Sequence, residues 1–325
     1  MGQSQMISIS RDQFPLQSAF TISRGSRSQA DVLTVTITRH GLSGRGECVP
    51  YARYHETSES VESQIRNVPE DASRDRLHEF LPPGAARNAL DCAFWDLEAK
   101  ATGHPVWKLA GLQPPVPAVT AYTISLGPPD QMRREATKNA HRPLLKVKLG
   151  TSSDLQKLEA VREGAPKSIL VVDANEGWSP ELYLDLIAHM VRLDIKLIEQ
   201  PFAVSADDYL RTLSRPIPVC ADESCHDRST LDTLTGKYDF INIKLDKTGG
   251  LTEALSLFRA AREADFGIMV GSMLSSSLAI APAVLLAQDA DYVDLDGPML
   301  LAKDRRTPLI YDDLGVHPAS ITLWG

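Results

Sequence analysis

Two short strands are predicted in the first fifty residues from the alternation of apolar and polar positions. Between residues 31 and 39 every second position is apolar, with Leu33, Val35 and Ile37 on one face, which is typical of a half-buried antiparallel strand. A glycine-rich turn (residues 40–46) follows, and a second strand then runs into Cys48 and Val49.

From Pro82 the apolar positions change to helical spacing, and Gly103 lies just past the end of the predicted helix. The apolar stripe consists of Ala86, Leu90, Ala93, Phe94 and Leu97. Together with the two strands, this helix predicts an α+β unit.

After Pro117 the pattern becomes a series of short apolar runs that alternate with helical segments. The runs are VTAYTIS, LLKVK, ILVVD, KLIEQ, PVCAD, FINIK, GIMVG and YVDLD. Polar or glycine landmarks at their ends, from Lys148 to Asp294, are separated by 22 to 27 residues, which is about one β-α unit each. Eight such units predict a parallel barrel, in which the chemistry lies at the carboxyl ends of the strands.

Composition narrows the class of protein. A chain of 325 residues is too long for one simple core unless it forms an α/β barrel or two domains, and 43% hydrophobic with 23% charged residues is typical of a soluble globular protein. The net charge of -8 argues against nucleic acid or an anionic membrane as the main partner. The N-terminus lacks the apolar core of a signal peptide, and the longest apolar stretch, 273–287, is too short to span a bilayer. The four cysteines form no C-x-x-C pair, so we expect reduced thiols in a cytoplasmic protein.

Three acidic residues lie at the ends of consecutive predicted strands. They are Asp173, Glu199 and Asp222. Each alone could cap the next helix. Three converging carboxylates, however, repel one another unless a cation lies among them, and an all-oxygen cluster with room for water suits Mg²⁺ or Mn²⁺. A metal site is therefore predicted here.

Lysines flank this predicted metal site. Lys146 and Lys148 share one face of their strand. Either the strand is an exposed edge, where lysines prevent pairing with another strand, or this face opens onto a site. A neighbouring ammonium and a divalent cation both lower the pKa of a lysine, so Lys148 can serve as a base, with Lys146 contributing to that effect. In the sixth run we assign the same role to Lys244, and we expect Lys247, which has the opposite parity, in the following loop.

These pieces together resemble the enolase superfamily, in its muconate-lactonizing-enzyme-like branch. The resemblance rests on residues 82–98, then KVK, VVDANEGW, IEQP, CADES, NIKLDKTGG and GSM, in this order and spacing. It implies an α+β capping domain (residues 1–115, completed by the tail 303–325) on a modified (β/α)₇β barrel (residues 116–302).

The resemblance also implies a mechanism. Asp173, Glu199 and Asp222 would be the ligands of one Mg²⁺, with Mn²⁺ as a possible substitute, and Lys148 and Lys244 would be the two bases. A metal that holds the substrate carboxylate stabilises an enediolate, and one lysine on each face lets one remove the α-proton and the other return it on the opposite side. Racemisation or epimerisation would result. Members of this family often form symmetric dimers or octamers, so the resemblance also implies a homo-oligomer.

Asp294 and Asp296, again two residues apart at a strand end, indicate a clamp for an ammonium group or, alternatively, a solvated acidic loop. A D-x-D here resembles the dipeptide epimerases, in which it binds the α-ammonium of the dipeptide. Arg24 lies in a cap segment that covers the site in this family. In L-Ala-D/L-Glu epimerases this position faces the glutamate side chain of the substrate. Two alternatives stay open: Arg27 is close enough in sequence to be the true partner, or both arginines are solvated. Thr123 is a weaker candidate for substrate contact. The resemblance implies a dipeptide substrate and a role in recycling murein peptides.

Other functions stay open at this point. The same site could act on other dipeptides, or serve an o-succinylbenzoate synthase, an N-acylamino acid racemase or a cycloisomerase, whose substrates have no free ammonium. The chain could also be a silent binding protein, although both lysines and all three acids are present, or a Schiff-base aldolase, which would not need the acids.

Overall fold

The computed structural model describes residues 5–313 and 315–325. Its N-terminal part is a three-stranded antiparallel sheet in the order β1-β2-β3, made of β1 (Met6–Ile22), β2 (Gly25–Arg39) and β3 (Leu42–Cys48). The predicted strand at residues 31–39 is the second half of β2, and Leu33, Val35 and Ile37 are fully buried. The alternation of apolar residues therefore identified the buried face of the sheet correctly.

The long helix α3 (Ala85–Thr102) packs its predicted apolar stripe against this sheet. It begins three residues later than Pro82, because Gly84 adopts a φ of 143° that a helix cannot continue, and it ends at Gly103 in the left-handed conformation. Gly44 and Gly46 of β3 allow the close approach of α3, since a Cβ on either would lie 2.1 Å from a helix carbonyl oxygen. Shorter helices complete this part: α1 (Ser58–Arg66), α2 (Leu77–Phe80) and α4 (Val106–Leu109).

The eight predicted apolar runs form one parallel sheet in chain order, β4 to β11. Its strands are β4 (Tyr122–Ile124), β5 (Leu144–Lys148), β6 (Ile169–Asp173), β7 (Ile195–Glu199), β8 (Val219–Ala221), β9 (Phe240–Ile243), β10 (Gly267–Gly271) and β11 (Tyr292–Asp294). The N–H of Ala121 donates to the carbonyl of Val293 at 2.8 Å and joins the two ends of the sheet. The predicted (β/α)₇β barrel with a capping sheet is thus confirmed.

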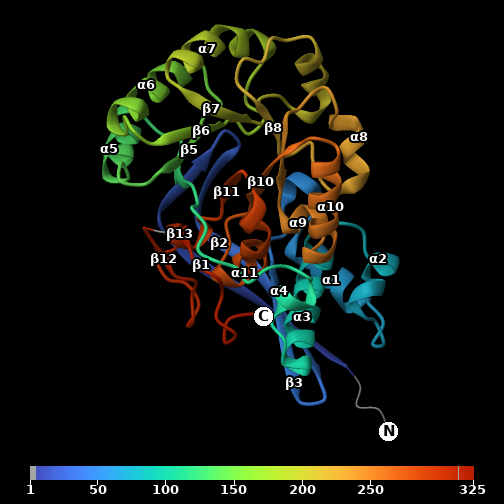
Figure 1. The fold of residues 1–325 in the computed structure, drawn as a ribbon. Helices are drawn as coiled ribbons and strands as arrows, with labels where there is room; N and C mark the ends of the chain where they lie inside the picture. Colours follow the sequence, from blue (N-terminus) through green and yellow to red (C-terminus); the bar gives the residue numbers. More distant parts are fainter. Residues whose placement is uncertain (1–4, 314) are drawn as a thin grey trace.

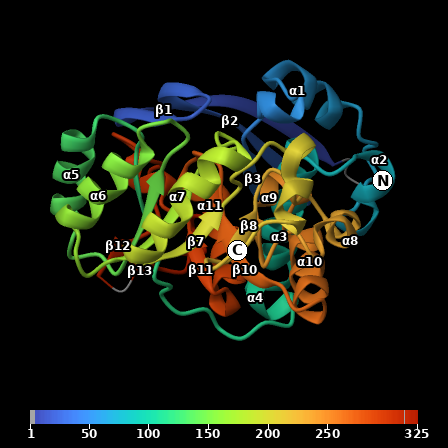
Figure 2. The ribbon, with the colours of Figure 1, turned by 90° about the horizontal axis from the view of Figure 1, so that it is seen from above.

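Helices surround the barrel, and the sheet β1-β2-β3 lies along one side of it (Figures 1 and 2). The helices are α5 (Pro129–Lys138), α6 (Asp154–Gly164), α7 (Pro180–Arg192), α8 (Leu231–Leu234), α9 (Leu245–Thr248), α10 (Leu251–Glu263) and α11 (Ser277–Leu286). Short 3-10 helices span Ala52–Tyr54, Arg74–Arg76, Val204–Arg211, Arg228–Thr230, Ala287–Asp289 and Gly297–Leu300.

The C-terminal segment returns to the N-terminal sheet and helix. It contains the short antiparallel pair β12 (Tyr311–Asp312) and β13 (Gly315–Val316). The indole N–H of Trp324 donates to the carbonyl of Cys92 in α3, and Arg45 of β3 donates to the carbonyl of Leu323. Arg305 forms an ion pair with the buried Glu47 of β3. These contacts hold the tail against the first hundred residues.

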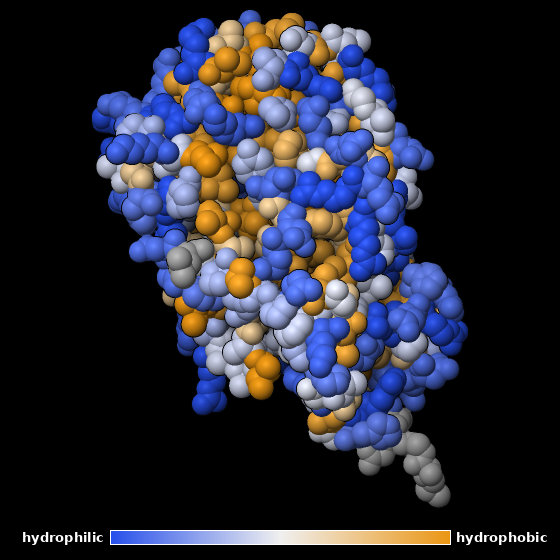
Figure 3. Space-filling view, viewed as in Figure 1, coloured by the Kyte–Doolittle hydropathy of each residue, from blue (hydrophilic) through white to orange (hydrophobic). Residues whose placement is uncertain are grey.

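Polar and apolar residues are mixed on the face drawn in Figure 3. Within the described residues, no helix is long and apolar enough to cross a membrane. All four cysteines are buried and free, as expected for reduced thiols.

Candidate active site

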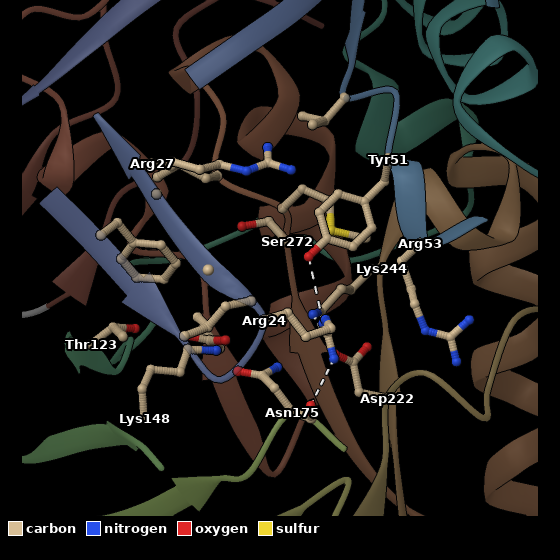
Figure 4. Close-up of a pocket in the computed structure, with 18 of the residues that line it drawn as sticks. Arg24, Arg27, Tyr51, Arg53, Thr123, Lys148, Asn175, Asp222, Lys244 and Ser272 are labelled. Carbon is tan, nitrogen blue, oxygen red and sulfur yellow. Dashed lines mark hydrogen bonds and ion pairs between the residues drawn. The ribbon is translucent and has the colours of Figure 1, made fainter. Parts of the chain in front are cut away.

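At the carboxyl ends of the barrel strands, most of the predicted charged residues line one cavity of about 470 Å³ (Figure 4). Asp173 and Glu199 are buried next to it, in ion-pair contact with the lining residues Lys148 and Lys146. The lysines come from β5 and from just after β9, which are four strands apart in the barrel, and segments of the cap complete the lining. Because consecutive parallel strands end at the same rim, residues 20 to 150 positions apart in the sequence become neighbours.

Asp173, Glu199 and Asp222 form a buried cluster in which one oxygen of each lies within 4.8 Å of the others. Their carboxylates supply three hard oxygen donors on three adjacent strands, the donor set that Mg²⁺ or Mn²⁺ prefers. The residues therefore fit a divalent cation. Burial and the carboxylate of Asp173 raise the pKa of Glu199 to about 7, whereas Lys148 and Lys146 hold the pKa of Asp173 below its usual value despite burial.

The two predicted bases flank this cluster. The ammonium of Lys148 lies 2.7 Å from Oδ2 of Asp173, and that of Lys244 lies 2.6 Å from Oδ2 of Asp222. Both side chains are less than a tenth exposed. Burial would lower the pKa of Lys244, but Asp222 and Glu199 raise it above the usual value.

Lys146 is fully buried and points into the acidic cluster. Its ammonium contacts Glu199 at 2.6 Å, Asp294 at 2.7 Å and Asp173 at 3.1 Å. Burial would lower its pKa, but these three carboxylates raise it well above the usual value. Lys146 and Lys148 share Oδ2 of Asp173, which places their ammonium groups close together; that Lys146 tunes Lys148 stays a prediction.

The expectation for Lys247 was wrong. It lies in the one-turn helix α9, only 2% exposed, and its ammonium contacts Oδ1 of Asp222 at 2.6 Å and the carbonyl of Asn242 at 2.9 Å. The parity argument failed because helix α9 begins at Leu245, directly after Lys244, so the alternation of a strand no longer applies at Lys247. Both lysines therefore hold Asp222.

Asp294 and Asp296 lie together at the end of the eighth strand and line the cavity. Oδ2 of Asp296 accepts a hydrogen bond from the backbone N–H of Thr123 at 2.6 Å, and burial and Asp294 raise its pKa to about 7. Oδ1 of Asp294 is buried and has no hydrogen-bond partner within the described residues. This unpaired acceptor at the cavity wall suits a cationic ligand. Thr123 also lines the cavity.

Arg24 lies at the tip of the β1-β2 hairpin and reaches into the cavity (Figure 4). Its guanidinium donates to the carbonyl of Asn175 at 2.8 Å and forms an ion pair with the buried Glu223 at 2.7 Å. Arg27 instead stacks over the ring of Tyr51 at 5.2 Å and forms no ion pair within the described part of the chain.

The sequence analysis missed several residues of this cavity. Its lining also includes Arg53, Tyr54, Asn175 and Glu223, and Arg53 forms an ion pair with Glu176. Glu223 directly follows the predicted metal ligand Asp222, and this position could have identified it as a residue of the site. The Arg53–Glu176 pair joins positions 123 apart, which no local pattern reveals.

Comparisons with known proteins agree with this architecture. Residues 131–309 match the family described as enolase C-terminal domain-like, and residues 5–111 match the mandelate racemase / muconate lactonizing enzyme N-terminal domain. The chain belongs to the enolase superfamily.

Within the enolase superfamily, several relatives are similar over nearly the whole chain. The chain is 43% identical over 317 residues to an L-Ala-D/L-Glu epimerase of Escherichia coli (96% of this chain, 99% of that protein). It is 42% identical over 300 residues to an N-acetyl-D-glutamate racemase of a Pseudoalteromonas species (90% and 95%). A solved structure of an enolase family member from Agrobacterium tumefaciens with homology to dipeptide epimerases, containing sodium and L-Ala-L-Glu, superimposes with a TM-score of 0.97 at 47% identity, covering 99% of this chain and 100% of that one.

Proposed function

We propose that this enolase-superfamily protein is an isomerase that epimerises dipeptides of the L-Ala-D/L-Glu type with the help of Mg²⁺. The observation that carries the proposal is the placement of Lys148 and Lys244 at the ends of β5 and β9, four strands apart in the barrel, each in contact with a different carboxylate of the buried acidic cluster. The relatives named as dipeptide epimerases support the same reaction.

The two lysines provide the proton transfers. One neutral amine removes the proton from the α-carbon of the second residue, and the ammonium on the other side returns a proton to the opposite face, which inverts the configuration. Asp173, Glu199 and Asp222 would hold Mg²⁺, which when bound would neutralise the charge that develops on the substrate's terminal carboxylate. Lys146 and Lys247 hold these carboxylates in place through their ion pairs.

The cavity wall accounts for the choice of a dipeptide. The unpaired Oδ1 of Asp294, with Asp296 beside it, would accept hydrogen bonds from the α-ammonium of the first residue. Arg24 would approach the side-chain carboxylate of a glutamate at the second position. We infer a role in recycling murein peptides from this preference.

A second candidate is racemisation of an N-acylated glutamate, which the similarity to the N-acetyl-D-glutamate racemase favours. The same lysines and Arg24 would serve this reaction. It would leave the acidic pair Asp294 and Asp296 without a ligand, because an N-acyl group carries no positive charge.

The deciding experiment follows the α-proton of L-Ala-L-Glu by NMR in D₂O with Mg²⁺ present. We expect the glutamate α-proton signal to disappear while a second, deuterated diastereomer forms. Lys148→Met and Lys244→Met should each abolish epimerisation while the acidic cluster still binds Mg²⁺ in a calorimetric titration. Full activity in either variant would refute the two-base mechanism, and turnover of N-acetyl-glutamate without turnover of any dipeptide would favour the second candidate.

A further inference from the structure

The turn between β6 and α7 has an unusual backbone beside the cavity. Asn175 and Glu176 follow the predicted metal ligand Asp173 closely, and they have positive φ angles of 45° and 66°. Two consecutive non-glycine residues rarely adopt the left-handed region, and such strain persists only where surrounding contacts hold it. Contacts with the surrounding structure must therefore hold this turn in place.

Two separate segments of the cap dock onto this turn. From the β1-β2 hairpin, Ser23 and Arg24 donate to the carbonyl of Asn175 at 3.0 Å and 2.8 Å. From the 3-10 helix Ala52–Tyr54, Arg53 makes a two-pronged hydrogen bond to the carboxylate of Glu176, with both N···O distances 2.7 Å.

Glu176 joins these segments to one another and to the barrel. Arg24 also approaches its carboxylate at 3.3 Å, and the N–H of Val204, the first residue of the 3-10 helix after β7, donates to it at 3.1 Å. The side chain of Glu176 is only 9% exposed, whereas that of Arg53 is 35% exposed. Although burial would raise the pKa of Glu176, the hydrogen bonds from Arg53 and Val204 lower it below the usual value. The carboxylate is thus charged, and both of its oxygens accept hydrogen bonds from neighbouring residues.

The same two segments form the cap side of the cavity wall. Residues 20 to 27 and 51 to 54 contribute most of the cap's lining, and Tyr51 lies within 3.5 Å of Arg24. Arg53 itself points away from Lys244 (Figure 4), so it does not reach the reacting atoms from there. Its contact with Glu176 acts on the position of the wall.

We propose that Glu176 is a positioning residue that docks both cap segments onto the barrel and so sets the direction in which Arg24 faces the substrate. This inference rests on the proposed function for its effect on turnover, and the docking itself is independent of it. Because docking orders a binding wall and leaves the lysines and the acidic cluster in place, its loss should weaken substrate binding far more than it slows the chemical step.

The test compares Glu176→Gln, Arg53→Gln and the double variant, with Arg228→Gln as the matched control. Arg228 makes the same two-pronged pair with Glu253, at 2.9 Å and 3.0 Å, and neither residue lines the cavity. Gln at position 176 keeps an acceptor for Val204. We expect KM for L-Ala-L-Glu to rise about tenfold in each single variant, which corresponds to about 1.4 kcal/mol of lost binding. The value of kcat should change less than about twofold, and the double variant should be no worse than Glu176→Gln alone, because both substitutions break one contact.

Hydrogen exchange gives a readout that needs no turnover. The backbone amides of residues 20–27 and 51–55 should exchange faster in Glu176→Gln and not in Arg228→Gln. Unchanged exchange together with an unchanged KM would overturn the inference, as would additive costs in the double variant or a loss confined to kcat. If the wild-type protein turned over no dipeptide but Glu176→Gln still accelerated exchange in both segments, the proposed function would fail and the docking role would stand.

Discussion

Replacing Arg305 by Met should remove a buried ion pair between the C-terminal tail and the N-terminal sheet. The Arg305 guanidinium donates to Glu47 of β3 at 2.6 Å and 3.0 Å, to Thr34 of β2 and to Ser276 of the loop before α11. It therefore joins the tail, the sheet and the barrel at one point. Met has a similar length and no charge, so the substitution removes the ion pair with little change in volume.

The magnitude follows from the burial of Glu47, which is 1% exposed. Breaking a buried pair by removing one partner leaves an uncompensated charge and costs about 3–5 kcal/mol, a large fraction of the 5–15 kcal/mol that stabilises a typical domain. Burial already raises the pKa of Glu47 against the opposing effect of Arg305. Without Arg305 the pKa should rise further. A buried acid with a raised pKa in the folded state contributes to stability while it is protonated. This contribution is lost as the pH rises through that pKa and the group ionises. The free energy of unfolding of the variant should therefore be lower at pH 8 than at pH 5.

Urea unfolding at both pH values measures the loss, and two further variants identify its cause. The double variant Glu47→Gln/Arg305→Met should recover all but about 1 kcal/mol, because Gln keeps an acceptor for Ser276 without burying a charge. Arg306→Met, at the exposed neighbouring arginine, should change stability by less than about 0.5 kcal/mol. A loss below about 1 kcal/mol in Arg305→Met, or no recovery in the double variant, would refute the reasoning.

Three further outcomes are expected. Burial raises the pKa of Asp246 from 3.8 to about 7, so its neutral form supports the fold fully below about pH 4 and progressively less up to pH 7. Asp246→Asn should remove this pH dependence from the free energy of unfolding in urea, by at most about 3 kcal/mol between pH 5 and 8; an unaltered pH profile would contradict this. Asp294→Asn should raise KM for L-Ala-L-Glu at least about tenfold and leave turnover of N-acetyl-glutamate, if any, little changed; equal effects on both substrates would exclude an ammonium clamp. Mg²⁺ at a hundred times its Kd should stabilise the wild-type protein by about 2.7 kcal/mol in thermal unfolding, and a shift that persists in Asp222→Asn would locate the ion elsewhere.

The order of the elements and the residues at their ends could be predicted from the sequence because they depend on local patterns. The period of two in residues 31–39, the stripe in α3 and the eight apolar runs reflect which backbone positions must be buried. The proximity of the strand-end acids and Lys148 could be predicted because the carboxyl ends of parallel barrel strands lie at one rim. The division near residue 115 and the roles of these residues stay predictions.

Only the tertiary structure decided which charged groups meet. Lys247 contacts Asp222 because the chain turns into α9 just after β9. The alternation of side chains along the strand cannot be extended into this helix, so it did not predict the direction of Lys247. Glu176 meets Arg53 because two cap segments fold onto the turn after β6, and Arg305 meets Glu47 because the tail crosses back to β3. Ion pairs of this kind depend on distance in space, and partners 123 or 258 positions apart leave no periodic pattern in the sequence.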